Sequence, residues 1–288
     1  MKKLGFIGVG IMGKSMVRNL MKAGYEVSIY TRTKEKVLDV ISEGAIWCDT
    51  IAECVKDKEA VFSIVGYPKD VEEVYFSEIG ILNSVTQGTY IVDMTTTSPK
   101  LAIKIYEEAK KKGIHALDAP VTGGDIGAKE GTLTIMVGGE EEHYKACEPI
   151  FSVMGRHIIY QGKAGNGQHT KMANQIVIAG TLSGVCEAMI YAKKTGLDVN
   201  KMMNTISTGS AGSKQLETVA PRILKEDYNP GFFIKHFIKD MSIAVEEAQE
   251  RGLDLNILEK VLSMYRDLEK EGKGDLGTQA LIKYYEEH

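Results

Sequence analysis

The chain has 288 residues and a formal net charge of −4, from 35 basic and 39 acidic side chains. This length allows two domains or one large α/β domain. Because basic and acidic residues are nearly balanced and form no basic block, the sequence gives no indication of binding to nucleic acid or to an anionic membrane. The hydrophobic fraction of 43% is that of a globular protein. The sequence contains no run of eighteen or more apolar residues, so we predict no membrane span. Glycines interrupt the apolar residues of the N-terminus, which favours a first strand over a signal peptide. The four cysteines lack C-x-x-C spacing, so we expect reduced thiols, no metal site and a cytoplasmic location.

Strands and helices alternate in the first half of the chain. Short apolar runs bounded by glycine or turn residues predict strands, and runs with an apolar residue every three or four positions predict helices. The predicted strands cover residues 3–9, 26–30, 60–65, 89–96, 115–120, 134–139 and 157–162, and the predicted helices cover 14–24, 33–45, 69–76, 99–113 and 140–155. This alternation predicts an α/β domain with a doubly wound parallel sheet, the Rossmann fold.

After Gly165 only helices are predicted. An unbroken stretch, 169–196, predicts one long helix of about 40 Å at 1.5 Å per residue. Further helical stretches follow at 199–209, 216–227, 232–252, 257–272 and 277–288. We therefore predict a dinucleotide-binding domain over 1–163 and an all-helical domain for substrate binding and oligomerisation over 164–288, joined by the long helix.

A G-x-G-x-x-G motif ends the first predicted strand and opens the first predicted helix. In a dinucleotide site Gly8 allows a tight turn, Gly10 lets the backbone approach the pyrophosphate, and Gly13 lets helix and strand pack closely. The helix N-terminus, at Ile11 and Met12, then offers free N–H groups and a partial positive charge to the phosphates. A glycine-rich turn without a ligand is the alternative, but the position at the start of a βαβ unit favours a dinucleotide.

The end of the second predicted strand bears on the choice between NAD(H) and NADP(H). NAD sites usually carry Asp or Glu there to accept from the ribose 2′-hydroxyl, whereas this chain reads Thr31-Arg32-Thr33. The Arg32 guanidinium can pair with a 2′-phosphate, with the two threonine hydroxyls beside it. We therefore predict NADP(H) as the preferred cofactor. If Arg32 is a solvated loop charge that only stacks on the adenine, NAD(H) remains usable.

Ligands of doubly wound sheets bind at the carboxyl ends of the strands, so the next strand ends are further cofactor candidates. The third predicted strand leads into Val65-Gly66-Tyr67. The fourth ends near Thr95 and Thr96, whose hydroxyls can reach a nicotinamide ribose. Threonines before a helix that opens with proline are also ordinary helix caps, and both interpretations stay open.

A glycine-rich loop, Thr122-Gly123-Gly124, follows the fifth predicted strand. Consecutive glycines expose backbone N–H groups, and a hydroxyl stands beside them, so the loop can hold a carboxylate. A crossover loop without a ligand has the same sequence signature.

Four motifs, in order and spacing, resemble the β-hydroxyacid dehydrogenase family, which includes 3-hydroxyisobutyrate dehydrogenases, tartronate semialdehyde reductases and glyoxylate/succinic semialdehyde reductases. They are GFIGVGIMG, DAPVTGG with the following GTLTIMVGG, GNGQHTKMANQ, and the Lys239-Asp240 pair. The resemblance spans essentially the whole chain. It implies that Lys171 is the catalytic lysine, that the loop 122–124 binds the substrate carboxylate, and that Lys239 lies near cofactor and substrate.

Two departures from the family pattern concern the substrate site. Thr122 stands where serine is usual, and Asn174-Gln175 stands where most members have two asparagines. The Asn-Gln pair, AGS at 211–213 and PGF at 230–232 are similar to the tartronate semialdehyde reductase branch, and Phe232 is a further cofactor-site candidate. The cofactor loop is closer to that of the NADPH-using reductases.

Lys171 shares a predicted helix face with Asn174, Gln175 and Ile178, because these positions follow i, i+3, i+4 and i+7. The apolar residues that continue this stripe point the face toward packed protein. A lysine there can donate a proton to a substrate oxygen, or remove one in the reverse reaction, with Asn174 and Gln175 as orienting groups. A solvated charge is the ordinary interpretation of a helical lysine, and the inward face and the four motifs together favour chemistry.

The sequence therefore predicts an NADP(H)-dependent oxidoreductase that interconverts a small carboxylated aldehyde and its hydroxy acid. The candidate aldehydes are tartronate or methylmalonate semialdehyde, glyoxylate and succinic semialdehyde. The alternatives are an NADP-binding interaction module without turnover and an imine reductase. The resemblance disfavours both, because relatives of either kind lack the lysine. The helical half suits self-association, so we expect a homo-oligomer, dimer or tetramer.

Overall fold

A computed structural model describes residues 1–287, and the chain divides into two compact units, Met1–Lys171 and the part from Met172 onward. Each unit has its own apolar core. The boundary predicted at 163/164 lies just before helix α9 (Asn166–Thr195), and the division between the compact units falls inside that helix.

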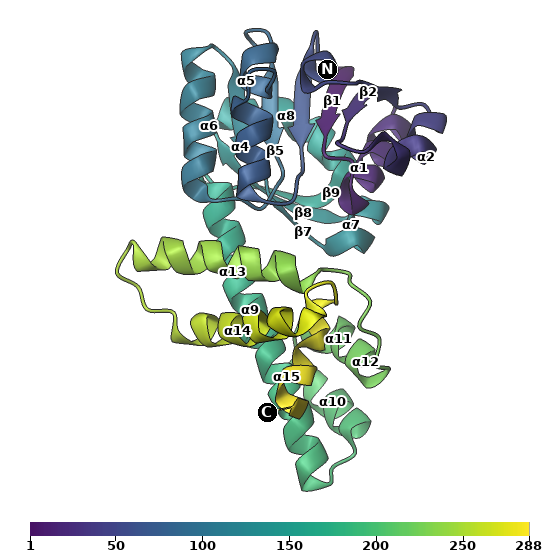
Figure 1. The fold of residues 1–288 in the computed structure, drawn as a ribbon, viewed down its shortest axis with the longest axis vertical. Helices are drawn as coiled ribbons and strands as arrows, with labels where there is room; N and C mark the ends of the chain where they lie inside the picture. Colours follow the sequence, from purple (N-terminus) through teal and green to yellow (C-terminus); the bar gives the residue numbers. More distant parts are fainter. Residues whose placement is uncertain (288) are drawn as a thin grey trace. The chain divides into compact units, whose positions relative to one another are not determined.

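A nine-stranded sheet forms the centre of the first unit, in the order β3-β2-β1-β4-β5-β6-β8-β7 with β9 paired to β8 (Figure 1). Strands β1 to β6 pair in parallel, whereas β8 runs antiparallel to both β6 and β7. The doubly wound fold predicted from the sequence is confirmed, with an antiparallel departure after β6. The strands are β1 (Lys3–Ile7), β2 (Glu26–Tyr30), β3 (Ile46–Trp47), β4 (Ala60–Ser63), β5 (Tyr90–Asp93), β6 (His115–Asp118), β7 (Val121–Thr122), β8 (Leu133–Gly139) and β9 (Gly155–Tyr160).

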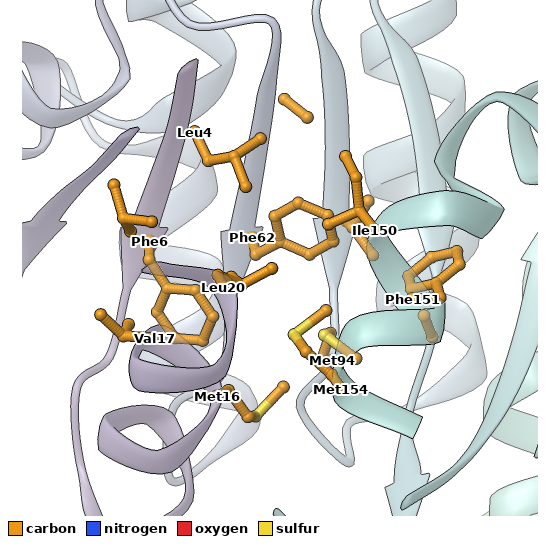
Figure 2. Close-up of a cluster of buried hydrophobic side chains, with 14 of the residues drawn as sticks. Leu4, Phe6, Met16, Val17, Leu20, Phe62, Met94, Ile150, Phe151 and Met154 are labelled. Carbon is orange, nitrogen blue, oxygen red and sulfur yellow. The ribbon is translucent and has the colours of Figure 1, made fainter. Parts of the chain in front are cut away.

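Helices cover both faces of this sheet, because successive side chains of a strand point to opposite faces and both sets are apolar. Phe6 and Phe62 pack with α1 and α8 on one face, and Figure 2 shows Phe62 beside Phe151 of α8. Their neighbours Ile7 and Val61 pack with α3, α4, α5 and α6 on the other face. The helices are α1 (Ile11–Lys22), α2 (Leu38–Ser42), α3 (Ile51–Val55), α4 (Pro68–Phe76), α5 (Ile81–Ser84), α6 (Pro99–Lys111), α7 (Gly124–Glu130) and α8 (Glu141–Met154).

The described part of the second unit is built from helices, as predicted. Helices α13 and α14 lie side by side in its core (Figure 1). The single helix predicted over 216–227 is two short helices, because Pro221 lies in the first turn of the second one. The helix predicted over 277–288 begins with a 3₁₀ turn, and His288 lies outside the described residues. After α9 the helices are α10 (Val199–Ser207), α11 (Lys214–Thr218), α12 (Ala220–Leu224), α13 (Ile234–Gln249), α14 (Asn256–Leu268) and α15 (Leu281–Glu287).

Helix α9 is long and apolar enough to cross a membrane when judged by length and composition alone. The core helix of a globular protein passes the same test, and Leu182, Cys186 and Met189 of α9 belong to the core of the second unit. The helix also carries buried polar side chains with hydrogen-bond partners in the protein, described below. Such groups are costly in lipid.

All four cysteines are buried and free. Among residues 1–287 no three or more His, Cys, Asp or Glu side chains are grouped so that they could hold a metal ion.

Candidate active site

The turn between β1 and α1 has the geometry that a dinucleotide requires. Gly8 adopts φ +93°, and a Cβ there would lie 2.0 Å from the carbonyl oxygen of Ile64, so only glycine fits. A Cβ on Gly13 would lie 2.2 Å from the Gly8 carbonyl oxygen, because the helix packs closely on the turn. The Cβ position of Gly10, in contrast, has nothing within 4 Å, and Ile11 beside it is 62% exposed. This open space lets a pyrophosphate approach the backbone.

The N-terminus of α1 adds a favourable field to that space. No side chain caps this end, and the first turn, which includes Met12, carries no acidic residue. The free N–H groups and the partial positive charge of a 12-residue helix are therefore unopposed locally. The residues present fit the phosphates of a nicotinamide dinucleotide.

The end of β2 presents Thr31, Arg32 and Thr33. The Arg32 side chain is 76% exposed, and its Nη1 lies 3.3 Å from Oδ1 of Asp70. The other oxygen of Asp70 accepts from the backbone N–H of Tyr67 at 3.1 Å, which caps α4. A single exposed contact of this length holds the guanidinium weakly, so Arg32 can turn toward another anion.

The ends of β4 and β5 are joined by a threonine hydroxyl. The Thr95 hydroxyl accepts from the backbone N–H of Val65 at 2.9 Å, and Thr95 is only 1% exposed. Its side chain is therefore engaged within the protein, whereas Thr96 is half-buried. Gly66 is half-buried and Tyr67 is 38% exposed in the loop that follows β4.

The predicted carboxylate loop leaves its backbone exposed. Thr122 ends β7 and pairs with Thr134 of β8. Gly123 and Gly124 have φ of +130° and +66°, and both are exposed. Two successive left-handed residues make a tight turn that favours glycine at both positions.

Asp118, at the end of β6, holds the first turn of α9. Its Oδ1 accepts from the N–H of Gly165 at 2.8 Å, and its Oδ2 accepts from the N–H of Gln168 at 2.9 Å. These are N–H groups of the kind that a helix start leaves without a partner. Burial raises the pKa of this carboxyl. The contact is close, because a Cβ on Gly167 would lie 2.5 Å from the carbonyl oxygen of Met136.

The Gln168 side chain joins the same turn to the end of β5. Its Oε1 accepts from the N–H of Thr97 at 3.0 Å, and its Nε2 donates to the carbonyl oxygen of Thr95 at 2.8 Å. Gln168 is fully buried, and Lys171, three residues further along α9, is 6% exposed. The helix that carries Lys171 is thus bonded to the ends of both β5 and β6.

A second buried carboxyl lies at the end of β5. Oδ1 of Asp93 accepts from the Ser63 hydroxyl at 3.0 Å and from the N–H of Thr95 at 3.1 Å. The Ser63 hydroxyl is also 2.9 Å from that of Tyr75. These partners are neutral, and burial raises the pKa of Asp93 to about 6.

Sequence reasoning missed Asp93, Asp118 and Gln168 as parts of this site. The one available signal was spacing: Gln168 lies three residues before Lys171 and therefore shares its helix face. A polar residue on an inward face needs hydrogen-bond partners, which singles it out.

Three of the other predicted substrate residues, Asn174, Gln175 and Lys239, belong to a polar chain within the second unit. Asn174 Nδ2 donates to Gln175 Oε1 at 2.7 Å, and Gln175 Nε2 donates to Asp240 Oδ2 at 2.5 Å. Lys239 Nζ lies 2.7 Å from Asp240 Oδ1. Both ends of the Gln175 amide are engaged with protein groups. Phe232, which is 36% exposed, lies before α13.

The predicted residues therefore fall into two sets. Those of the first unit lie in the turns after β1, β2, β4 and β5, in β7 with the loop after it, and in the first turns of α9. The carboxyl ends of parallel strands are where doubly wound sheets bind ligands. Asn174, Gln175, Phe232 and Lys239 belong to the second unit.

Comparisons with known proteins show the family to which the chain is related. Residues 3–162 match the family model for the NAD binding domain of 6-phosphogluconate dehydrogenase, and residues 165–285 match the model for NAD-binding of NADP-dependent 3-hydroxyisobutyrate dehydrogenase. The chain is 52% identical over 284 residues to the uncharacterized oxidoreductase YkwC of Bacillus subtilis (strain 168), which covers 99% of each chain. It is 36% identical over 284 residues to 2-hydroxy-3-oxopropionate reductase of Escherichia coli (strain K12), which covers 99% of this chain and 97% of that one.

Solved structures show the same relationship. The structure of Mycobacterium tuberculosis 3-hydroxyisobutyrate dehydrogenase with L-serine matches with a TM-score of 0.91 and 27% identity, covering 99% of both chains. The chain belongs to the β-hydroxyacid dehydrogenase family of NAD(P)-dependent oxidoreductases.

Proposed function

We propose that this protein reduces a small carboxylated aldehyde to the hydroxy acid with NADPH, and catalyses the reverse reaction, with Lys171 as general acid and base. The observation that carries the proposal is the burial of Lys171, 6% exposed, one turn after a helix start that is bonded to the ends of β5 and β6. A buried lysine held this firmly at the ligand-binding edge of a dinucleotide fold is suited to proton transfer.

A bound nicotinamide cofactor would supply the hydride that the carbonyl carbon of the aldehyde accepts. Negative charge develops on the carbonyl oxygen, and the Lys171 ammonium stabilises that charge and donates a proton to the oxygen. The product is the hydroxy acid, and the neutral amine then takes up a proton from solvent. In the reverse direction the neutral amine removes the hydroxyl proton. The low dielectric around a buried ammonium strengthens its effect on the developing charge.

The substrate class follows from the loop at 122–124 and from the relatives. A hydroxyl beside two exposed glycines can hold the substrate carboxylate. Tartronate semialdehyde, which is 2-hydroxy-3-oxopropionate, is the first candidate because the Escherichia coli relative is named for it. The Asn174-Gln175 pair, which resembles that branch, supports the same choice.

The preference for NADPH rests on Arg32. The guanidinium is exposed and weakly held by Asp70, and the tip of β2 carries no carboxylate to accept from a ribose 2′-hydroxyl. We also propose a homo-oligomer, dimer or tetramer, which light scattering tests. One side of α9 stays exposed and apolar, with Val177 66% and Tyr191 68% exposed.

The experiment is a steady-state panel of tartronate, methylmalonate and succinic semialdehydes and glyoxylate, each with NADPH and NADH. We expect the highest kcat/KM for tartronate semialdehyde with NADPH. Arg32→Ala should raise KM for NADPH by roughly 10-fold, because hydrogen bonds to charged groups contribute about 1.5–3 kcal/mol, and should leave KM for NADH unchanged.

The matched control is Arg156→Ala, which removes an exposed arginine of β9 and should alter neither KM. Absence of turnover with every aldehyde would refute the proposed function. If the wild type used NADH as well as NADPH or better, only the role of Arg32 would be refuted, and the proposed reaction would stand.

A further inference from the structure

Gln168 makes a matched pair of hydrogen bonds to one short loop. Its side-chain oxygen accepts from the N–H of Thr97, and its side-chain nitrogen donates to the carbonyl of Thr95. Both partners are backbone groups at the end of β5, and Gln168 has no exposed surface. A glutamine amide is the neutral side chain that offers one acceptor and one donor at this length.

The loop that Gln168 contacts is itself part of the ligand-binding edge. Thr95 accepts from the N–H of Val65 after β4 and donates its own N–H to Asp93 of β5. Hydrogen bonds therefore run from the ends of β4 and β5, through the Gln168 amide, to the first turn of α9.

Gln168 and Asp118 hold this turn in different ways. Asp118 accepts two N–H groups, including that of Gln168, so the helix start remains capped when the Gln168 side chain is altered. The Gln168 side chain instead determines how the turn sits against the 95–97 loop. Lys171 follows three residues later, and a displacement of about 1 Å at a reacting group can cost on the order of 100-fold in rate.

We propose that Gln168 is a positioning residue for Lys171: its buried amide fixes the lysine-bearing turn of α9 against the Thr95–Thr97 loop, and thereby places the proton donor relative to the bound cofactor. The inference rests on the proposed role of Lys171. It adds a residue to which neither the family models nor the relatives' names assign a role.

Two substitutions test it. Gln168→Met keeps the approximate length and removes both hydrogen bonds. Gln168→Glu keeps the shape: its ionised form can accept from Thr97 but repels the Thr95 carbonyl, whereas its protonated form restores both hydrogen bonds. Burial disfavours the ionised form, so protonation should occur in an accessible pH range.

We expect kcat of Gln168→Met to fall by about 30-fold or more at every pH, with the Kd of NADPH close to wild type. The midpoint of thermal unfolding should fall as well, because the Thr97 N–H and the Thr95 carbonyl are left buried without this partner. The kcat of Gln168→Glu, divided by that of the wild type at the same pH, should rise by about 10-fold between pH 8.5 and pH 6. The control is Gln161→Glu, because Oε1 of Gln161 accepts from Thr170 of α9 at 3.2 Å and Thr170 keeps its bond to the Asn166 carbonyl. Its kcat ratio should not change with pH.

The inference is wrong if Gln168→Met keeps kcat within about threefold of wild type, or if the Gln168→Glu ratio does not change with pH. It is also wrong if kcat and NADPH affinity fall together, because that pattern indicates general disruption of the cofactor site and not the positioning of Lys171. Should Gln168→Met not fold, the pH dependence of Gln168→Glu decides alone. Wild-type turnover in the same series separates the two proposals. An inactive wild type would count against the proposed function. A fully active Gln168→Met would count only against the proposed role of Gln168.

Discussion

Helix α9 carries two buried glutamines, Gln168 and Gln175, and the first and second units use them differently. Gln168 bonds to backbone groups of a loop between β5 and α6, which the sheet holds in place. Gln175 bonds to the side chains of Asn174 and Asp240, which depend on their own rotamers. The first arrangement fixes a position through the fold, and the second fixes it through neighbouring side chains.

The two units also differ in the partners of their buried carboxylates, Asp93 in the first unit and Asp240 in the second. Asp93 receives hydrogen bonds from the neutral donors Ser63 and Thr95, and burial raises its pKa to about 6. Asp240, equally buried, lies 2.7 Å from the Lys239 ammonium. Neutral donors hold a buried acid at a cost to its charged form, whereas an ammonium partner stabilises the charge. The two regions should therefore respond differently to mutation.

The largest effect on stability is expected in the second unit. Asp240→Ala removes the buried carboxylate beside the Lys239 ammonium, whose side chain is 12% exposed, and breaking such a pair costs about 3–5 kcal/mol. Urea denaturation should therefore show a free energy of unfolding lower by about 3 kcal/mol.

Lys270→Ala is the matched control, because it breaks an exposed pair with Asp267, with side chains 76% and 41% exposed. Its effect should stay below about 0.5 kcal/mol. Similar losses for the two variants would mean that Asp240 is not held by a buried pair.

A smaller effect that depends on pH is expected in the first unit. Because the folded-state pKa of Asp93 is raised to about 6, the folded state holds the proton more tightly than the unfolded chain does. This contribution to stability is complete at low pH and is lost as pH rises through 6. Asp93→Asn abolishes the titration, so the stability of the variant relative to wild type should rise by about 1 kcal/mol from pH 5 to pH 7.5. Urea denaturation at the two pH values measures it, and a difference that is constant or falls with pH would contradict the assignment.

A comparably small effect is expected for Gln175→Asn, which introduces the asparagine usual in the family. The shorter amide cannot reach both Asn174 and Asp240, so one hydrogen bond is lost, worth about 1 kcal/mol in unfolding free energy. We expect kcat to fall by only about threefold, because the substrate does not contact this amide in our account. Gln249→Asn makes the same change on the exposed side of α13 and should alter neither quantity. A loss of activity of 100-fold or more would instead make Gln175 a direct substrate ligand.

The parts of the fold and site that could be predicted are those whose geometry restricts which residue types can stand at those positions. Gly8 and Gly13 are glycines because a Cβ would collide with backbone, and the alternation of strands and helices follows from apolar spacing. The antiparallel direction of β8 could not be predicted, because a run of apolar residues like that of β8 is equally typical of a parallel strand. The role of Gln168 could not be predicted either, because its partner Thr95 lies 73 positions away and is a backbone carbonyl, which any residue would supply.

The role of Lys171 as proton donor is tested most directly by single-turnover hydride transfer from NADPH in Lys171→Met, with the best aldehyde of the panel. We expect a rate at least about 100-fold below wild type, with NADPH affinity and the circular dichroism spectrum unchanged, because the proton donor is lost and the fold is not. Lys194→Met, which removes an exposed lysine of the same helix, should match wild type. Hydride transfer by Lys171→Met within about threefold of wild type would contradict the assignment of Lys171 as the general acid.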